Sequence, residues 1–255
     1  GADLTVSSIT SSAGEFVIGG FTSSTVITPA NSTTFTVTFD PTTLGANNAT
    51  IIVNSDDTDE MAYDFAVTGE GVNSNTSDII ANAAFVYEEN IDYTIYQGNP
   101  IAFGNSVDVF QFDIRDGGAS NDADALTTEL TDITFNVVNI NNVRSAALFN
   151  GNALVANNPV IAGNNISFSG LSYAAPDNGS ASLSLRVTFL TTVTDNDQLQ
   201  FTISAATANA SGSIFGTADA GGSTSSTIGN RNRIEVTADR LNFLQQPSTT
   251  STNAT

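Results

Sequence analysis

Residues 33–39 read Thr-Thr-Phe-Thr-Val-Thr-Phe, and this stretch decides the fold class. Phe35, Val37 and Phe39 alternate with threonine, so they share one face of an extended strand while threonine covers the other face. Aromatic and β-branched residues at a period of two are typical of a strand with one buried side. The stretch therefore predicts a half-buried β-strand.

The same alternation recurs along most of the chain. It continues in residues 49–53 and 63–67, and Asp40-Pro41 and Leu44-Gly45 mark turns between strands. Further strands are predicted at residues 107–114, 133–139, 165–169, 181–190, 198–205 and 233–237. Helical character is confined to short stretches such as residues 123–130. We therefore expect an all-β chain of tandem antiparallel β-sandwich modules of the immunoglobulin-like type.

The length and one polar segment indicate how the chain is divided. A chain of 255 residues suits two ordinary domains. Residues 73–78, Asn-Ser-Asn-Thr-Ser-Asp, are polar and have no periodicity, which is typical of a linker. A second, longer β region of one elaborated sandwich is expected after it.

The charge balance restricts the partners. The chain has 26 acidic residues against six basic ones and a net charge of −20. A nucleic-acid partner is not expected, since binding a polyanion needs a basic surface. The same charge argues against adsorption to anionic lipid. Direct membrane insertion is not expected either, because no apolar run approaches the roughly 18 to 20 residues of a spanning helix.

The residue types that are missing argue against catalysis. The chain contains no Cys, His or Trp, and all six basic residues are Arg. Disulfides, the Ser-His-Asp triad, the usual zinc hydrolase chemistry and Lys Schiff bases are therefore excluded. A carboxylate-pair glycosidase would still be possible, but sugar-binding clefts commonly stack rings on Trp. The expected protein is not an enzyme.

The first part of the chain resembles a known family. From Asp3 to Val72 it is similar to the immunoglobulin-like repeats of the ASPM-SPD-2-Hydin type, the choice-of-anchor D regions of bacteria. The segments that carry the resemblance are residues 3–9, 35–41, 54–57 and 67–71. Family members normally have another strand or two before the segment at residues 4–7. The resemblance therefore implies that the first domain, residues 1–74, is truncated at its N-terminus.

The rest of the chain resembles other bacterial surface modules. Residues 79–238 look like a module of giant cell-surface adhesins of gliding Bacteroidota. The segments concerned are residues 116–118, 122–126, 145–151 and 230–236. Residues 239–255 lie in a tail that is similar to the opening of another surface repeat, through its apolar pair, Gln-Pro and Ser/Thr run. A third repeat is therefore expected to begin at residue 239.

These resemblances imply a function that composition alone does not show. They imply a non-catalytic segment of a very large secreted adhesin, displayed on the bacterial cell surface, exported by type IX secretion and used in gliding motility. Its expected partners are neighbouring modules of the same chain, surface glycans and components of the secretion system. Two alternatives stay open: a spacer or carbohydrate-binding region of a secreted multidomain hydrolase, and a passive stalk.

One acidic cluster is the candidate metal site. Asp113, Asp116, Asp122 and Asp124 lie around a Gly-Gly turn, and together they could converge on one hard cation. Ca²⁺ prefers such oxygen ligands and is the natural counter-charge for an acidic chain. The spacing is not that of an EF-hand loop. The alternative interpretation is a solvated acidic turn.

Other polar segments have simpler interpretations. Asp195-Asn196-Asp197 and residues 54–60 are predicted to be turns between strands. Residues 219–222 and 230–233 flank a long Ser/Thr/Gly loop, which could bind a ligand, join the cation site or simply connect strands. Arg231 and Arg233 in this region are expected to pair with nearby aspartates.

A group of aromatic residues also has two interpretations. Tyr87, Tyr93, Tyr96 and Phe103 cluster in one stretch of the sequence. Exposed tyrosines could form a contact surface for a sugar or a protein. Packing against the core of the sandwich explains the same residues equally well.

Overall fold

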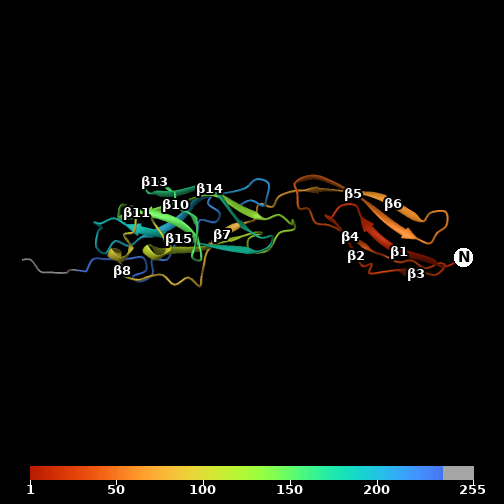
Figure 1. Ribbon diagram of the computed structural model, residues 1–255, viewed down its shortest axis with the longest axis horizontal. Helices are drawn as coiled ribbons and strands as arrows, with labels where there is room; N and C mark the ends of the chain where they lie inside the picture. Colours follow the sequence, from red (N-terminus) through yellow and green to blue (C-terminus); the bar gives the residue numbers. More distant parts are fainter. Residues whose placement is uncertain (238–255) are drawn as a thin grey trace, which may run out of the picture.

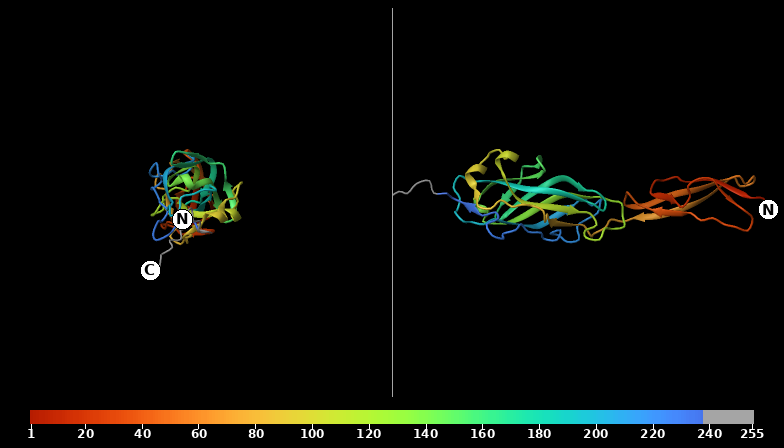
Figure 2. Two further views of the ribbon diagram at one scale, coloured as in Figure 1. Left: turned by 90° about the vertical axis from the view of Figure 1, so that its left-hand side faces the viewer. Right: turned by 90° about the horizontal axis from the view of Figure 1, so that it is seen from below.

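A computed structural model describes residues 1–237 and confirms the all-β fold class. The strands of residues 4–71 and those of residues 78–235 form separate sheets, which follow one another along an elongated molecule (Figures 1 and 2). The predicted start of a third repeat at residues 239–255 lies outside the described residues. Within residues 1–237, no helix has the length and apolar content needed to cross a membrane.

The first module consists of residues 1–72. Its strands are β1 (Leu4–Ser11), β2 (Phe16–Gly19), β3 (Thr25–Ile27), β4 (Thr36–Phe39), β5 (Gly45–Ser55) and β6 (Ala62–Gly71). A four-stranded sheet, β3-β1-β5-β6, faces a sheet of two strands, β2-β4. The stretch at residues 33–39 supplies β4, and the ring of Phe39 lies 4.8 Å from that of Phe16. The small core is therefore built from the alternating residues that predicted it.

The second module has two larger sheets. Its strands are β7 (Asp78–Ala81), β8 (Ile91–Asp92), β9 (Val107–Arg115), β10 (Thr128–Val138), β11 (Val143–Asn150), β12 (Ala153–Ala156), β13 (Val160–Ala162), β14 (Asn165–Ala175), β15 (Ser180–Phe189), β16 (Gln200–Ala208) and β17 (Ile234–Glu235). Three short 3₁₀ helices are η1 (Tyr93–Tyr96), η2 (Phe103–Asn105) and η3 (Ile140–Asn142). The sheet β13-β14-β10-β16 packs on the sheet β12-β11-β15-β9-β7, and β17 pairs with β8.

The core of the second module lies between its two sheets. Phe110 and Phe112 of β9 and Phe135 of β10 are fully buried. The rings of Phe112 and Phe135 are 5.7 Å apart, and Phe135 also meets Phe168 of β14 edge to face. Aromatic pairs in such tilted and edge-on geometries add to the stabilisation gained from burial.

The predicted secondary structure differs from the structure in several places, and the short strands β2, β3, β7, β12 and β13 are among those not predicted. The helical prediction for residues 123–130 is wrong, because residues 123–127 form a loop and β10 starts at Thr128. Thr128 and Leu130 are buried and pair with Ala175 and Tyr173 of β14, so the burial gained in the sheet outweighs local helix propensity. Strand β11 was not predicted, although it lies inside the five-stranded sheet.

The connection between the modules is short and partly built into the second module. Strand β6 ends at Gly71 and β7 begins at Asp78, so the predicted linker at residues 73–78 contains the crossing. Ser77 is buried, and Asp78 forms an ion pair with Arg115 of β9. Within the described part of the chain, no hydrogen bond or ion pair joins residues 1–72 directly to residues 77–237. The linker therefore carries the polar contacts of the junction.

Candidate metal centre

The candidate centre is built around the loop between β9 and β10, residues 116–127. Gly117 and Gly118 open this loop, both with left-handed φ angles of 67° and 66°. A Cβ on Gly118 would lie 2.4 Å from the carbonyl oxygen of Thr76 in the linker. Glycine is needed because any side chain would collide with that backbone. The loop therefore folds tightly against the linker.

Asp116 is the buried anchor of the centre. It is 1% exposed, and it accepts hydrogen bonds from the Thr128 hydroxyl and from the Asn178 backbone N–H at 2.9 Å. Because the hydrogen of the Thr128 hydroxyl goes to Asp116, the Ser77 hydroxyl donates to Thr128, at 2.7 Å. Ser77 in turn accepts from the Gly117 N–H. The hydroxyl of the linker residue Ser77 is thus connected to the Asp116 carboxylate through the Thr128 hydroxyl.

The turn between β14 and β15 places a further carboxylate, that of Asp177, close to Asp116 and Asp122 of the β9–β10 loop. Residues 176–179 read Pro-Asp-Asn-Gly, and the Gly179 N–H closes the turn on the Pro176 carbonyl at 2.9 Å. Asn178 has a left-handed φ of 51° and contacts all three acidic residues. Its N–H donates to Asp116, its side-chain amide donates to Asp177, and its side-chain oxygen accepts from the Asp122 N–H. Asn178 therefore holds these three aspartates at fixed positions relative to one another.

Asp116, Asp122 and Asp177 each offer a carboxylate oxygen, and these oxygens lie within 4.8 Å of one another. Both carboxylate oxygens of Asp122 are buried, and neither has a hydrogen bond of normal geometry. Asp177 is exposed, so the group is open to solvent on one side. Three converging carboxylates of this kind can bind a hard divalent cation.

Within the described residues 1–237, no ion pair compensates the charge of the three carboxylates. Burial is the main cause that raises the pKa of Asp116, Asp122 and Asp177 above the usual range. Repulsion from neighbouring carboxylates adds to each shift, including that of Asp40 in the first module on Asp177. Arg115, next in sequence to Asp116, is already bonded to both carboxylate oxygens of Asp78.

The structure brings together only part of the predicted set. Asp116 and Asp122 belong to the group, whereas Asp113 and Asp124 are not among its members. Asp113 lies on β9 and accepts hydrogen bonds from Asn82 and Ser182. Asp124 accepts from the N–H groups of Ser74 and Leu126 and from the Ser213 hydroxyl. Both carboxylates thus have structural partners.

Asp177 is the residue that sequence reasoning missed. It lies about sixty positions after Asp116, beyond the reach of any local spacing argument. One signal was available, because Asp-Asn-Gly between two predicted strands is typical of a hairpin turn. Such a turn places its side chains at the end of the sandwich where the loop after β9 also lies.

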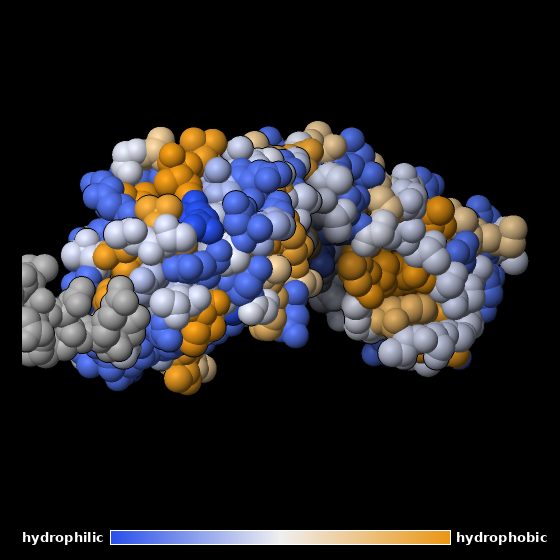
Figure 3. Space-filling model, turned by 60° about the vertical axis from the view of Figure 1, so that its left-hand side comes forward, coloured by the Kyte–Doolittle hydropathy of each residue, from blue (hydrophilic) through white to orange (hydrophobic). Residues whose placement is uncertain are grey.

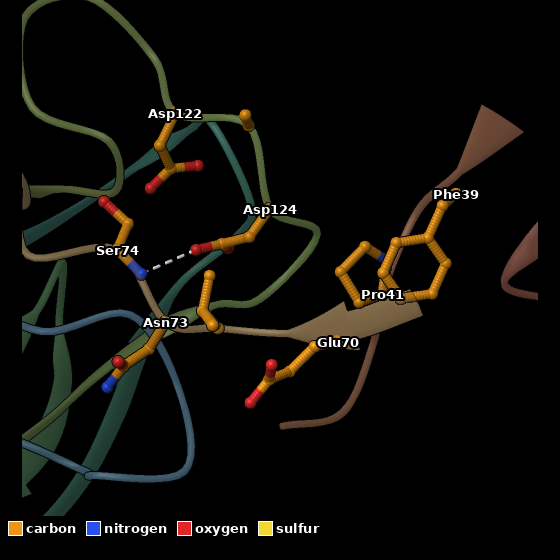
Figure 4. Close-up of a pocket in the computed structure, with 9 residues that line it drawn as sticks. Phe39, Pro41, Glu70, Asn73, Ser74, Asp122 and Asp124 are labelled. Atoms are coloured by element: carbon orange, nitrogen blue, oxygen red, sulfur yellow. Dashed lines mark hydrogen bonds between the residues drawn. The ribbon is translucent and has the colours of Figure 1, made fainter. Parts of the chain in front are cut away.

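A cavity of about 340 Å³ lies beside the group, at the junction of the modules. Figure 4 shows Asp122, Asp124 and Ser74 on one side and Phe39 and Pro41 of the first module on the other, with the Ser74 N–H donating to Asp124 at 2.8 Å. Carboxylates of both modules thus line the cavity, Asp122 and Asp124 from the second and Glu70 from the first, and the first module adds the apolar side chains of Phe39 and Pro41.

The other acidic segments have structural roles. Residues 195–197 form a turn in which Asn196 has a left-handed φ of 63°. Residues 54–60 cover the end of β5 and most of the loop of the β5–β6 hairpin, where Asp56 accepts from the Thr5 N–H at 2.7 Å. Asp219 accepts from Thr217 and Gly221 within its own loop and does not belong to the group of three.

The expected pairing of Arg231 and Arg233 with aspartates is wrong. Within residues 1–237 the ion pairs are Arg115 with Asp78 and Arg186 with Asp108. Arg231 bonds the Ser226 hydroxyl and lies over the ring of Tyr87, while Arg233 bonds neutral oxygens. The two guanidinium groups are bonded to hydroxyl, backbone and amide oxygens of the neighbouring loops instead of to carboxylates.

The aromatic group is used mainly within the module. Tyr93 and Tyr96 pack against the core, and the Tyr96 hydroxyl donates to Glu88. The Tyr87 hydroxyl accepts from the Ser226 N–H, and the ring of Phe103 lies under the guanidinium of Arg186. These contacts favour the packing interpretation over a ligand surface.

Comparisons with protein-family models, with curated proteins and with solved structures find no match to this chain.

Proposed function

We propose that this chain is a non-catalytic segment of a very large secreted protein of the bacterial cell surface, an adhesin in which modules are joined end to end. The observation that carries the proposal is the arrangement of the modules. The N-terminus lies at one end of the molecule, and β17, the last described strand, pairs with β8 at the far end of the second module (Figure 1). Modules arranged in this way extend an array with each addition.

The chemistry of the chain supports a role without catalysis. Asp116 is buried and hydrogen-bonded, so it cannot reach a substrate as a paired catalytic carboxylate would need to. The side chains that catalysis most often uses at neutral pH, His and Cys, do not occur in the sequence. An acidic surface rich in Thr, Ser and Asn suits a module that stays soluble outside the cell.

Export through type IX secretion and a part in gliding belong to the same proposal. Both rest on the similarity of residues 79–238 to modules of giant adhesins. Surface glycans are the proposed adhesive ligand, and neighbouring modules of the same chain are the proposed structural partners.

The test is to locate the protein on the cell and to ask what it binds. Antibodies raised against residues 1–237 should label intact cells of the source organism as strongly as permeabilised cells. Labelling that needs permeabilisation would contradict a surface protein. A glycan array probed with the same fragment separates the adhesin from a passive stalk, because a stalk binds no glycan above an albumin control.

A further inference from the structure

Asp122 presents a charge that the protein does not neutralise. Each of its carboxylate oxygens has less than 1 Å² of accessible surface and no hydrogen bond of normal geometry, although the residue as a whole keeps some exposed surface. Burial raises the pKa of Asp122, and the nearby Ser74 hydroxyl and Asp124 N–H offset this only in part. Burying an ionised carboxylate without a partner is strongly unfavourable. Asp116 and Asp177 add two further carboxylates within 4.8 Å. This arrangement needs a positive charge at its centre.

Within residues 1–237, each arginine side chain is bonded to partners outside the group of three aspartates. The sequence contains neither Lys nor His. Arg115, the basic residue closest in sequence to the group, is held by Asp78 through two bonds from its guanidinium. We therefore expect the positive charge to come from solution, as a cation that enters on the side of the exposed Asp177.

The ligands select the kind of cation. All candidate donors are carboxylate oxygens, which suit Ca²⁺, Mg²⁺ and Mn²⁺ rather than metals that prefer thiolate or imidazole. Two of the ligands come from the β9–β10 loop and one from the β14–β15 turn, and the last of these faces solvent. Ca²⁺ accepts such irregular coordination completed by water, whereas Mg²⁺ demands near-ideal octahedral geometry.

The centre is also connected to the linker. Residues 74–77 contact the β9–β10 loop at three points: the Ser74 N–H donates to Asp124, the Thr76 carbonyl lies against Gly118, and the Ser77 hydroxyl accepts from the Gly117 N–H. Across the junction, Asp40 of the first module repels Asp177. A cation would tie the loop to the β14–β15 turn and relieve this repulsion.

From these contacts we infer that Asp116, Asp122 and Asp177 form a Ca²⁺ site, and that Ca²⁺ binding fixes the orientation of the first module on the second. The inference goes beyond the proposed function and does not depend on it. A solvent-open site of three carboxylates is expected to bind with a Kd on the order of 0.1–1 mM, the range of extracellular calcium modules.

The first test is thermal unfolding of residues 1–255 in EDTA and in 10 mM CaCl₂ at matched ionic strength. Since this concentration is roughly 10- to 100-fold above the expected Kd, Ca²⁺ should raise the Tm of the second module by about 3–10 °C. MgCl₂ should raise it much less. Equal midpoints in EDTA and CaCl₂, or equal effects of the two cations, would overturn the site.

Variants separate binding from charge screening. Asp122→Asn should unfold at a higher temperature than the wild type in EDTA, because it removes the uncompensated charge, and should lose the response to Ca²⁺. Asp177→Asn, at an exposed position, should weaken Ca²⁺ binding by at least roughly tenfold and serves if the first variant does not fold. Asp64→Asn, on exposed strand β6, is the matched control and should respond as the wild type does. A full Ca²⁺ response in Asp122→Asn and Asp177→Asn would overturn the assignment.

The second test measures the junction. The chain has no Cys, so spin labels on Thr58→Cys and Asn152→Cys report one distance between the modules. Ca²⁺ should narrow the distribution of that distance in the labelled wild type and leave it unchanged in labelled Asp122→Asn. A wild-type distribution that stays broad although Ca²⁺ raises the Tm would overturn the link to module orientation and leave the site standing.

Discussion

The two modules follow the same alternating pattern but bury very different cores. In the first module the core cluster has three buried residues, Phe16, Ala49 and Ile51, with the other apolar side chains only partly buried. In the second module one cluster of buried residues extends through both sheets. Figure 3 shows the consequence, as hydrophobic surface gathers in a hollow of the first module.

The difference lies in the facing sheets. The four strands of β3-β1-β5-β6 face only two strands, β2 and β4, whereas four strands face five in the second module. A two-stranded sheet cannot cover the inner face of a four-stranded one, so Phe35, Phe39 and Phe65 stay half-buried. Alternation thus sets the fold class, while the number of opposing strands sets how much of the apolar face leaves water.

The largest expected effect tests this comparison directly. Phe135→Ala in the fully buried core of the second module should lower its free energy of unfolding by about 3–5 kcal/mol. Phe39→Ala in the first module should cost only about 1–2 kcal/mol, because less area leaves water on folding. Hydrogen exchange in urea, resolved to individual peptides by mass spectrometry, measures the stability of each module separately. Equal losses would show that the first core is as closed as the second.

The next effect concerns a buried charge that the second module holds and the first does not. Burial raises the pKa of Asp108 to about 6, and its ion-pair partner Arg186, with a nitrogen 3.5 Å away, offsets this only in part. Since the folded pKa lies above the unfolded value, the second module should lose stability as pH rises from about 4 to 6. The loss is at most about 3 kcal/mol.

Asp108→Asn isolates this contribution. The free energy of unfolding, measured in urea between pH 4 and pH 7, should change less with pH in the variant than in the wild type. At pH 7 the variant should unfold at a higher urea concentration. Arg186 keeps its bonds to the Ser106 hydroxyl and the Phe103 carbonyl, so it is not left without partners. Parallel pH profiles for the two proteins would refute the raised pKa.

A smaller effect tests whether the β9–β10 loop of the second module holds the linker in place. Gly118→Ala places a methyl group against the Thr76 carbonyl and should destabilise the loop by about 2–3 kcal/mol. Gly163→Ala is the control, because its φ of 57° is similar but no atom lies within 4 Å; about 1 kcal/mol is expected there. Proteolysis at residues 72–76 should quicken only in Gly118→Ala. Equal cleavage of both variants would mean that the loop does not hold the linker.

The smallest effect concerns the strand that follows the linker. Arg115→Gln removes the half-buried pair with Asp78 that holds β7 to β9 and should cost about 1 kcal/mol or less. Exchange of β7 amides should quicken while those of the first module stay unchanged. A loss as large as that of Phe135→Ala would mean that the edge strand, rather than the core, limits the second module.

The sequence supports the prediction of long strands whose buried and exposed residues alternate. Residues 107–114 and 181–190 alternate, and both lie in predicted strands that the structure contains as β9 and β15. Strand β11 was not predicted because four consecutive residues are all buried, namely Ala146, Ala147, Leu148 and Phe149. Ala147 and Phe149 pack with Ile101 on the outer side of the sheet, so both faces are covered and alternation disappears.

The candidate site was predictable only where its ligands are local. The Gly-Gly turn next to Asp116 and Asp122 is visible in the sequence, but the role of Asp177 depends on the pairing of β14 with β10. Asp113 was included because spacing alone does not show that its side chain bonds to Asn82 and Ser182. Long-range strand pairing, rather than residue type, decides which carboxylates meet.

The strand order of the first module also determines how it would respond to a pull along the chain. Strand β5 is antiparallel to both β1 and β6, so β1 and β6 run in the same direction. Val6, near the start of β1, pairs with Ser55 toward the outer tip, and Gly71, at the end of β6, pairs with Gly45 at the junction. Tension between neighbouring modules would therefore load the backbone hydrogen bonds of β1, β5 and β6 in shear, many at once, instead of unzipping them singly. A module with a thin core can in this way bear tension through its ladder of hydrogen bonds.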